Sequence, residues 1–249
     1  MKNEKVSVVI PARLESMRLP GKVLLDIGGK PMLQWVWERA MSMGKAEEVV
    51  IATDSDEVFA RAQAWGAVAK MTPKECPNGT SRAAYLLDEL KGDFIINLQG
   101  DEPFMEPELL DALVEKRAEA GGDVVTAVRP IQDQVELFNH NVVKVARGGN
   151  SQALLFSRAT IPFVRDVPEE NWLATRKFWA HIGVYGYTRE ALTRYPTLSA
   201  GDLETTEKLE QLRFLEHGFS ITVVETNYRS IGVDTMADLE RARDILLAR

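Results

Sequence analysis

The stretch Val6-Ser7-Val8-Val9-Ile10 is the first regular element of the chain, and it indicates the fold class. The run is short, aliphatic and rich in β-branched residues, so it predicts a strand that is buried on both faces. Such strands belong to parallel sheets that are covered by helices on both sides. A long connection over residues 11–29 follows, and we expect it to lead into a helix over residues 32–43.

Strands and helices alternate through the rest of the first half. We expect strands at residues 48–53, 68–71 and 93–98. The helices between and after them are expected at residues 54–66, 80–90 and 106–120. This alternation is typical of right-handed βαβ units, so it predicts an α/β fold with a doubly wound, mostly parallel sheet.

The pattern changes after Gly121-Gly122. Two short apolar runs, at residues 142–146 and 152–156, flank Gly148-Gly149-Asn150 and predict an antiparallel hairpin. Further elements are expected as strands at residues 123–128, 181–187 and 221–225, helices at 203–217 and 235–247, and a loop at 163–177. We therefore expect a single domain over residues 1–249, with an inserted antiparallel lobe at about residues 123–187.

The composition excludes several classes of protein. Lysine and arginine number 30 and aspartate and glutamate 37, so the formal net charge is −7 and a nucleic-acid partner is disfavoured. The one cysteine, Cys76, cannot form an internal disulfide. No apolar run approaches the ~18–20 residues of a membrane span, and no signal peptide is visible. We expect a soluble, cytoplasmic protein without stable membrane insertion.

A basic loop leaves the first strand, at the edge of the sheet where open α/β proteins bind ligands. Arg13, Arg18 and Lys22 lie on this loop, in a chain that is acidic overall. Arginine binds phosphate oxygens through two parallel N–H groups and lysine acts as a point charge, so the loop predicts a polyphosphate site. Neither a Walker A motif nor a G-x-G-x-x-G fingerprint is present, and a solvated basic loop is the alternative.

Two aspartates are candidate metal ligands. Asp101 lies in Gln99-Gly100-Asp101-Glu102-Pro103, directly after the strand expected at residues 93–98. Mg²⁺ prefers one or two carboxylates together with phosphate oxygens, so an acid at this edge of the sheet suits it. Asp234, in Gly232-Val233-Asp234-Thr235, qualifies only if it folds back beside Asp101. Each aspartate could instead cap the helix that follows it.

Polar residues in the second half could contact a small polar ligand. His181 and Tyr185 share one face of a predicted strand. Glu207, Glu210 and Gln211 have the i, i+3, i+4 spacing that places them close to one face of the helix expected at residues 203–217. The alternatives are a histidine that only packs and a solvated helix face.

Taken together, these segments resemble the 3-deoxy-manno-octulosonate cytidylyltransferases, also called CMP-Kdo synthetases. The resemblance runs nearly from end to end, and its nine short motifs come in the same order at compatible spacing. They lie at residues 10–13, 18–22, 29–32, 52–54, 97–103, 156–162, 181–187, 209–213 and 232–235.

The resemblance implies a CTP-dependent nucleotidyltransferase. It would transfer CMP from CTP to the anomeric hydroxyl of an acidic eight-carbon sugar, 3-deoxy-D-manno-octulosonate (Kdo), and release pyrophosphate, with Mg²⁺ as cofactor. The product would supply lipopolysaccharide assembly. A homodimer is also implied, with the antiparallel lobe contributing to sugar binding and to the interface.

Three other functions remain open from the sequence. The same reaction could act on another acidic sugar, such as 8-amino-Kdo or a nonulosonate. The chain could be a nucleotide-sugar-binding protein without activity, although both candidate metal carboxylates are present. A Rossmann oxidoreductase is disfavoured because the glycine fingerprint is absent.

The resemblance also implies roles for single residues. The catalytic set is Arg13, Arg18, Lys22 and Asp101, of which the three basic residues hold the triphosphate. The metal ligands are Asp101 and Asp234. The nucleotide site comprises Ala12, Arg13, Lys22, Asn78, Gly79, Arg82 and Gln99. The sugar site comprises Gln99, His181, Tyr185, Glu210 and Gln211.

One segment departs from the family pattern. Family members usually carry Ser-Gly-Thr or Ser-Gly-Ser, an acid and then arginine, where this chain has Asn78-Gly79-Thr80-Ser81-Arg82. The missing acid at Ser81 removes a partner for a basic neighbour or for a ligand hydroxyl. The departure therefore bears on which acidic sugar is used and on how Arg82 is positioned.

Overall fold

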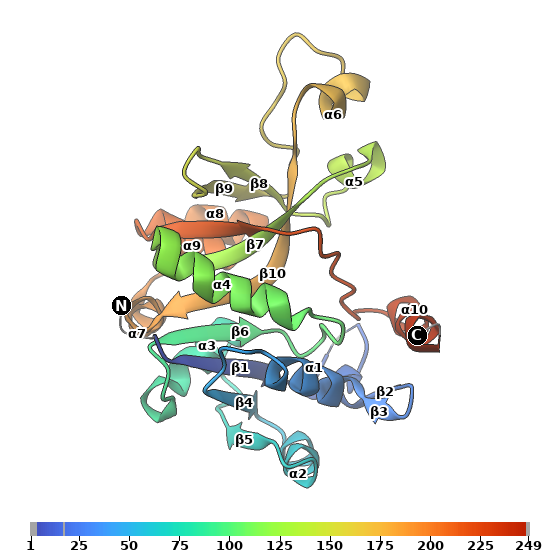
Figure 1. Ribbon diagram of the computed structural model, residues 1–249, viewed down its shortest axis with the longest axis vertical. Coiled ribbons are helices and arrows are strands. Elements are labelled where there is room, and N and C mark those ends of the chain that lie inside the picture. The colour runs from blue at the N-terminus through green and yellow to red at the C-terminus, as the bar shows by residue number, and fades with distance from the viewer. Residues whose placement is uncertain (1–3, 17, 248–249) are drawn as a thin grey trace. The chain divides into compact units, whose positions relative to one another are not determined.

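The computed structural model describes residues 4–16 and 18–247, and it confirms the α/β fold (Figure 1). Contacts divide the chain into two compact units, each built from segments that are separated in the sequence. Unit 1 comprises Met1–Val114, Gly186–Pro196 and Ser230–Arg249, and unit 2 comprises Glu115–Tyr185 and Thr197–Arg229. The single domain and the lobe at residues 123–187 stay predictions.

Unit 1 is built around a parallel sheet. Its central strand, β1 (Val6–Ala12), pairs in parallel with β4 (Glu48–Thr53) on one side and with β6 (Phe94–Leu98) on the other, and β5 (Val68–Met71) pairs with β4 (Figure 1). All but one of the residues of β1 are buried, as its aliphatic run predicts. The carboxyl ends of β1 and β6 therefore lie side by side, which brings together the loops that follow them.

Helices and short elements complete unit 1. α1 (Met32–Met41) and α3 (Gly79–Tyr85) both pack on β1, and α2 (Asp56–Ala64) packs on β4 and β5. The remaining elements are η1 (Lys22–Leu24), β2 (Asp26–Ile27), β3 (Lys30–Pro31), η2 (Leu87–Glu89), α7 (Arg189–Arg194) and α10 (Met236–Leu247). Three elements continue from one unit into the other along the chain: α4 (Pro107–Ala120), β10 (Trp179–Thr188) and η4 (Tyr195–Thr197).

The helix predicted at residues 80–90 is shorter than expected, because α3 ends at Tyr85 and η2 follows it. The reason lies in the carbonyl groups at this end. The Arg189 guanidinium donates to the carbonyl oxygens of Leu87 at 3.0 Å and Gly92 at 3.1 Å, and also to that of Leu90. The Arg189 side chain thus satisfies carbonyl groups of the segment that follows α3 and stabilises the early end of this helix.

Unit 2 contains the strands β7 (Val124–Pro130) and β11 (Ile221–Glu225), which pair in parallel. The predicted hairpin is confirmed, since β8 (Lys144–Arg147) and β9 (Ala153–Ser157) pair antiparallel. β10 (Trp179–Thr188) begins in this unit and pairs antiparallel with β8. The sequence analysis missed α5 (Gln134–Phe138) here and α7 in unit 1.

The loop predicted at residues 163–177 is wrong in part. It contains η3 (Glu169–Asn171) and α6 (Trp172–Thr175). Trp172 is buried and stacks on Phe178 with ring centroids 6.0 Å apart, in an apolar cluster with Leu137. Burying this large aromatic side chain stabilises a short helix that the mixed-charge sequence around it does not indicate.

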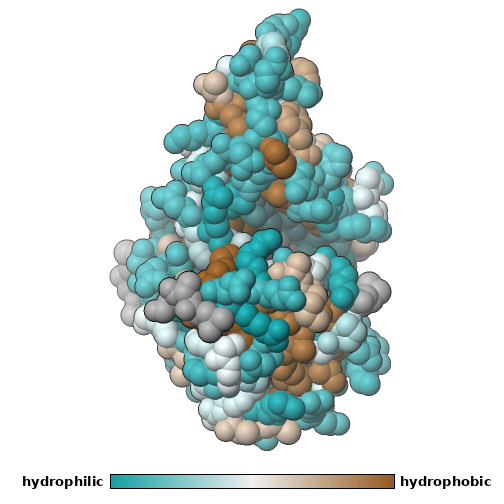
Figure 2. Space-filling model, turned by 90° about the vertical axis from the view of Figure 1, so that its right-hand side faces the viewer, coloured by the Kyte–Doolittle hydropathy of each residue, from teal (hydrophilic) through white to brown (hydrophobic). Residues whose placement is uncertain are grey.

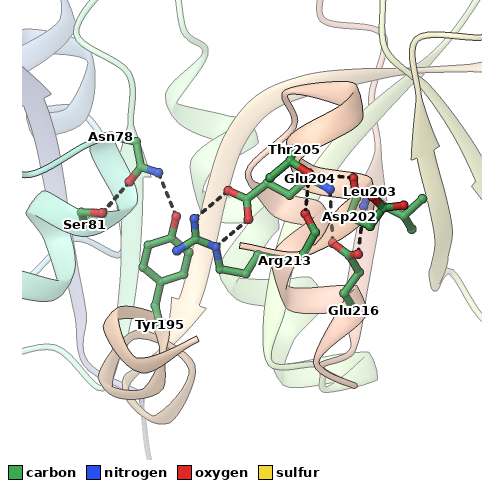
Figure 3. A network of polar contacts seen from close by, with 10 residues as sticks. Asn78, Ser81, Tyr195, Asp202, Leu203, Glu204, Thr205, Arg213 and Glu216 are labelled. Atoms are coloured by element: carbon green, nitrogen blue, oxygen red, sulfur yellow. Dashed lines mark hydrogen bonds and ion pairs between the residues drawn. The ribbon is translucent and has the colours of Figure 1, made fainter. Parts of the chain in front are cut away.

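The helix predicted at residues 203–217 is also wrong, because it is broken into α8 (Asp202–Glu207) and α9 (Gln211–Glu216). Lys208 adopts the left-handed conformation, with φ 54°, and ends α8. Two side chains from α9 stabilise the break (Figure 3). The Glu216 carboxylate accepts the Leu203 N–H at 2.9 Å, and Arg213 donates two hydrogen bonds to Glu204 at 2.6 and 2.7 Å.

Hydrophilic side chains prevail on the face shown in Figure 2, where hydrophobic ones form smaller patches. Within the part of the chain that the structure describes, no helix has both the length and the apolar composition needed to cross a membrane.

Candidate active site

In unit 1 the basic loop and the two candidate metal ligands meet. The Lys22 ammonium group contacts Asp101 Oδ2 at 2.6 Å and Asp234 Oδ1 at 2.8 Å. Arg18 Nη2 lies 2.9 Å from the other carboxylate oxygen of Asp234. Asp234 therefore does fold back beside Asp101, and the two carboxylates converge on one cation.

Hydrophobic packing brings these three parts of the chain together. Leu19 and Ile27 flank Lys22, Phe104 follows Asp101, and Val233 precedes Asp234. All four apolar residues belong to one buried cluster, which also includes Met32, Leu239 and Ala242. Burying these side chains is favourable, and the charged residues between them are carried to the same place.

Backbone contacts then set the spacing. The Val233 N–H donates to the Asp101 carbonyl at 3.0 Å, which ties the segment before α10 to the loop after β6. Gly100 allows that loop to approach β1, because a Cβ on Gly100 would lie only 2.8 Å from the Pro11 carbonyl oxygen. The basic loop is closed on itself by the Gly21 N–H, which donates to the Leu14 carbonyl at 3.0 Å.

Neither aspartate caps a helix. At the start of α10, Thr235 Oγ1 accepts from the Asp238 N–H at 3.2 Å, and the Asp238 carboxylate accepts from the Thr235 N–H at 3.0 Å. This reciprocal pair is a capping box, so Asp234 is not needed as a cap. Asp101 is separated from the first residue of α4, Pro107, by five residues. The capping alternative for both aspartates is therefore wrong.

The charge state of Lys22 follows from its neighbours. Burial alone would lower the pKa of Lys22, but Asp101 and then Asp234 act against it, and the net effect raises that pKa above its ordinary value. Lys22 is therefore a cation at neutral pH, and it neutralises part of the charge of the two carboxylates.

Arg13 differs from Lys22 because it has an unused donor. Its Nη2 atom is buried and has no hydrogen-bond partner among the residues that the structure describes. A buried guanidinium donor left unpaired is costly, so such a group suits a site that an anion completes.

The donor set fits a magnesium ion that is shared with a phosphate ligand. Two carboxylates already hold a cation within 2.8 Å, and Mg²⁺ is commonly held by one or two carboxylates plus substrate phosphates. In the described residues there is no group of three or more His, Cys, Asp or Glu that could enclose a metal by itself. Any ion bound here would therefore depend on oxygens from the substrate or from water.

The start of α3 explains the departure at Ser81. Asn78 is the N-cap, and its Oδ1 accepts from both the N–H and the hydroxyl of Ser81, each at 2.8 Å (Figure 3). Asn78 Nδ2 also donates to the Tyr195 hydroxyl at 2.8 Å. A serine followed three residues later by an acid forms a capping box, so we interpret the family's acid as a helix cap and the Asn78–Ser81 pair as its replacement.

Gly79 and Arg82 lie on α3 itself, and Gln99 lies against Gly79. Gly79 packs so tightly that an added Cβ would lie 2.9 Å from Pro11 Cγ and 3.3 Å from Gln99 Nε2. Ala12 is fully buried in β1. Arg82 is also fully buried, and its guanidinium is paired with Asp54 and Thr72. Arg82 thus stabilises the fold around the site, and its contact with a nucleotide stays a prediction.

In unit 2 the structure groups three of the predicted sugar residues. His181 and Tyr185 have ring centroids 5.3 Å apart, and the Tyr185 hydroxyl donates to Gln211 Oε1 at 3.2 Å. Burial lowers the pKa of His181 from 6.5 to about 3, so its imidazole is neutral at physiological pH. Glu210 precedes Gln211 as the N-cap residue of α9.

Glu207 does not share a helix face with these residues, because the break at Lys208 places it at the end of α8. Its carboxylate accepts from the Ser157 hydroxyl at 2.5 Å and from the Arg158 N–H at 2.9 Å. The spacing argument that joined Glu207 to Glu210 and Gln211 is therefore wrong.

Sequence reasoning missed Thr126, which lies beneath His181 with its Oγ1 2.9 Å from Nε2. The signal was available, since Thr126 is the one hydroxyl-bearing residue in the run Val124-Val125-Thr126-Ala127-Val128, and a buried hydroxyl needs a partner.

Comparisons with known proteins show which family the chain resembles in sequence and in structure. Residues 7–224 match the family model described as Cytidylyltransferase. The chain is 42% identical to a 3-deoxy-manno-octulosonate cytidylyltransferase of Acidobacterium capsulatum, over 100% of this chain and 99% of that protein. It is 41% identical to one of Geotalea uraniireducens, over 97% and 99%. A solved structure of CMP:2-keto-3-deoxy-manno-octonic acid synthetase complexed with CTP matches with a TM-score of 0.91 and 38% identity, over 98% of this chain and 99% of that one.

Proposed function

Because the chain belongs to the cytidylyltransferase family, we propose that it transfers CMP from CTP to the anomeric hydroxyl of Kdo and releases pyrophosphate. The observation that carries the proposal is the Lys22 ammonium group held between Asp101 and Asp234. Full-length relatives named for this reaction support Kdo as the acceptor, and they disfavour 8-amino-Kdo, a nonulosonate or an inactive binding protein.

CTP would be held mainly by the basic residues of unit 1. Arg13 has a buried donor without a partner in the described residues, so a phosphate oxygen would satisfy it. Lys22 and Arg18 now contact carboxylates, and they would turn to the phosphates as the aspartates bind metal. Ala12, Gly79 and Gln99 could present hydrogen-bonding partners to cytosine, which would let the site reject uracil.

Asp101 and Asp234 would hold Mg²⁺. When bound, Mg²⁺ neutralises charge on the phosphate oxygens and lowers the pKa of a hydroxyl that it contacts. The two carboxylates already lie within 2.8 Å of one shared cation, so little rearrangement of the backbone is required.

The reaction joins the anomeric oxygen of the sugar to the α-phosphorus of CTP and breaks the bond between that phosphorus and the β-phosphate oxygen. Negative charge grows on the phosphate oxygens, so positioning and neutralisation do most of the catalytic work. Lys22, Arg13 and Arg18 supply that positive charge. The hydroxyl proton leaves to solvent or to a basic oxygen, because His181, with a pKa of about 3, is a poor proton acceptor.

In unit 2, His181, Tyr185, Glu210 and Gln211 would bind the sugar. Magnesium dependence, a homodimer, a cytoplasmic location and a role in lipopolysaccharide assembly complete the proposal, and they rest on the family resemblance.

The proposal is tested by removing one carboxylate charge at a time. Asp101→Asn and Asp234→Asn should each lower the rate of pyrophosphate release from CTP and Kdo by about 100-fold or more, since each removes a ligand of the metal that neutralises the reacting phosphates. Asp56→Asn, at an exposed aspartate of α2, is the matched control and should keep full activity. Near-normal rates in both site variants would contradict the metal assignment.

A further inference from the structure

Thr126 of β7 has an unusual set of neighbours for a buried hydroxyl. Its side chain is fully buried in unit 2. Thr126 Oγ1 lies 2.7 Å from the Val184 carbonyl oxygen, 3.3 Å from the Ile182 carbonyl oxygen and 2.9 Å from His181 Nε2. Three polar atoms of β10 thus surround one hydroxyl group.

The positions of the hydrogen atoms around Thr126 Oγ1 can be assigned by counting hydrogen-bond donors and acceptors. A threonine hydroxyl has one proton to donate and two lone pairs that accept. Carbonyl oxygens only accept, and two oxygens 2.7 Å apart repel each other unless a proton lies between them. The Thr126 proton therefore points to the Val184 carbonyl, and the contact with His181 requires Nε2 to be the donor.

The protonation state of the other imidazole nitrogen, Nδ1, follows from this assignment. A neutral imidazole carries one proton, so a protonated Nε2 leaves Nδ1 as a bare acceptor. The ring stays neutral at physiological pH because burial lowers its pKa to about 3. The Phe156 ring meets the His181 imidazole edge-on, with ring centroids 5.1 Å apart, and the Tyr185 ring centroid lies 5.3 Å from that of the imidazole. The orientation of the imidazole is therefore constrained by two neighbouring rings.

Nδ1 is available for a ligand. It makes no hydrogen bond to the residues that the structure describes, and His181 is partly exposed. An acceptor nitrogen attracts a hydroxyl donor and repels the oxygens of a carboxylate, so its protonation state selects between the two kinds of group that a sugar acid carries.

We propose that Thr126 is a positioning residue that holds His181 as the Nε2–H tautomer, so that His181 accepts a hydrogen bond from a sugar hydroxyl and does not bind the sugar carboxylate. The choice of a sugar acid as the ligand rests on the proposed function, whereas the tautomer does not.

Gln211 complements His181. The Tyr185 hydroxyl donates to Gln211 Oε1 at 3.2 Å, which orients the carboxamide. Its Nε2 group is then a donor that is buried and has no partner among the described residues. Neighbouring side chains thus set His181 as an acceptor and Gln211 as a donor, and the carboxylate of the sugar should be bound by donors such as Gln211.

The tautomer can be read directly by long-range ¹H–¹⁵N correlation spectra of protein with ¹⁵N-labelled histidine, without substrate. In the wild-type protein we expect the His181 proton on Nε2 at pH 7. Thr126→Ser keeps the hydroxyl and should keep this tautomer, whereas the nearly isosteric Thr126→Val should give a mixture of tautomers. A wild-type Nδ1–H tautomer, or an unchanged tautomer in Thr126→Val, would overturn the proposal. The wild-type spectrum decides the first point even if Thr126→Val does not fold.

Adding Kdo tests the second part of the proposal, that His181 accepts a hydrogen bond from a sugar hydroxyl. The His181 signals should shift while the ring stays neutral, and Thr126→Val should raise the KM for Kdo about tenfold with little change in kcat or in the KM for CTP. Thr126→Ser should restore the KM. Protonation of the ring on Kdo addition would identify the carboxylate as its partner and overturn the inference. If the His181 NMR signals do not change when Kdo is added, although pyrophosphate is still released, this role of His181 is contradicted but the proposed function is not.

Discussion

At the scale of single residues, the structure shows which of the candidate side chains contact one another. Arg13, Lys22 and Asp101 could be chosen from their positions after predicted strands. Asp234 could not, because it is more than 130 residues from Asp101 along the chain and an aspartate before a helix is usually a cap. The ion pairs through Lys22 and the capping by Thr235 and Asp238 together remove that ambiguity.

Lys22→Met should destabilise the protein without metal, because it leaves two neighbouring carboxylates without their shared cation. We expect a loss of about 1–3 kcal/mol in the free energy of unfolding, measured by urea denaturation. Millimolar Mg²⁺ should recover part of it, since a cation that binds the folded state stabilises that state. The assignment of Asp101 and Asp234 as metal ligands would be contradicted if the variant were as stable as the wild type in EDTA and if Mg²⁺ did not change its free energy of unfolding.

His181 should make stability depend on pH. Burial lowers its pKa in the folded state to about 3, against 6.5 when unfolded, so the unfolded chain binds more protons between these values. Stability contributed by the neutral ring is therefore present above pH 6.5 and is lost as the pH falls, by about 2 kcal/mol between pH 7 and pH 5.

Urea denaturation at the two pH values measures the effect, with His181→Gln as the reference that lacks the group. The wild type should lose more stability than the variant on acidification. Equal losses in the two proteins would show that His181 is not the group responsible.

At the scale of elements, strands were predicted more accurately than helices. Short runs of mostly apolar residues placed β4, β5 and β11 at their observed bounds. Burial explains this for β4 and β11, whose residues are mostly buried, but not for the edge strand β5, which is partly or largely exposed. The helix predicted at residues 203–217 failed because its continuity is decided by contacts from a distance in sequence. Arg213 and Glu216 stabilise a break at Lys208 that local propensity does not reveal.

Asn78 offers a test at the start of α3. Asn78→Ala removes the cap on the Ser81 N–H and the hydrogen bond to Tyr195, so we expect a loss of about 1–2 kcal/mol in thermal or urea denaturation. Asn78→Ser keeps a capping oxygen but is too short to reach Tyr195, so its loss should be about half as large. Equal losses in the two variants would mean that capping contributes little.

At the scale of the whole molecule, the order of strands and helices was sufficient to predict the α/β class. The pairing of β1 with β6, which places their carboxyl ends side by side, was not predicted and comes from the structure. The division into two units was not predicted, because each unit is assembled from segments that are far apart in the sequence. The residues expected to bind CTP lie in unit 1, and His181, Tyr185, Glu210 and Gln211 lie in unit 2.

The most direct test of the account is to measure pyrophosphate release by the full chain with CTP and Kdo, with Mg²⁺ or EDTA, and with UTP in place of CTP. We predict release only when CTP, Kdo and Mg²⁺ are all present. Release that continues in EDTA, or that is as fast with UTP, would contradict the proposed site. No release with Kdo, although CTP binds, would contradict the proposed reaction.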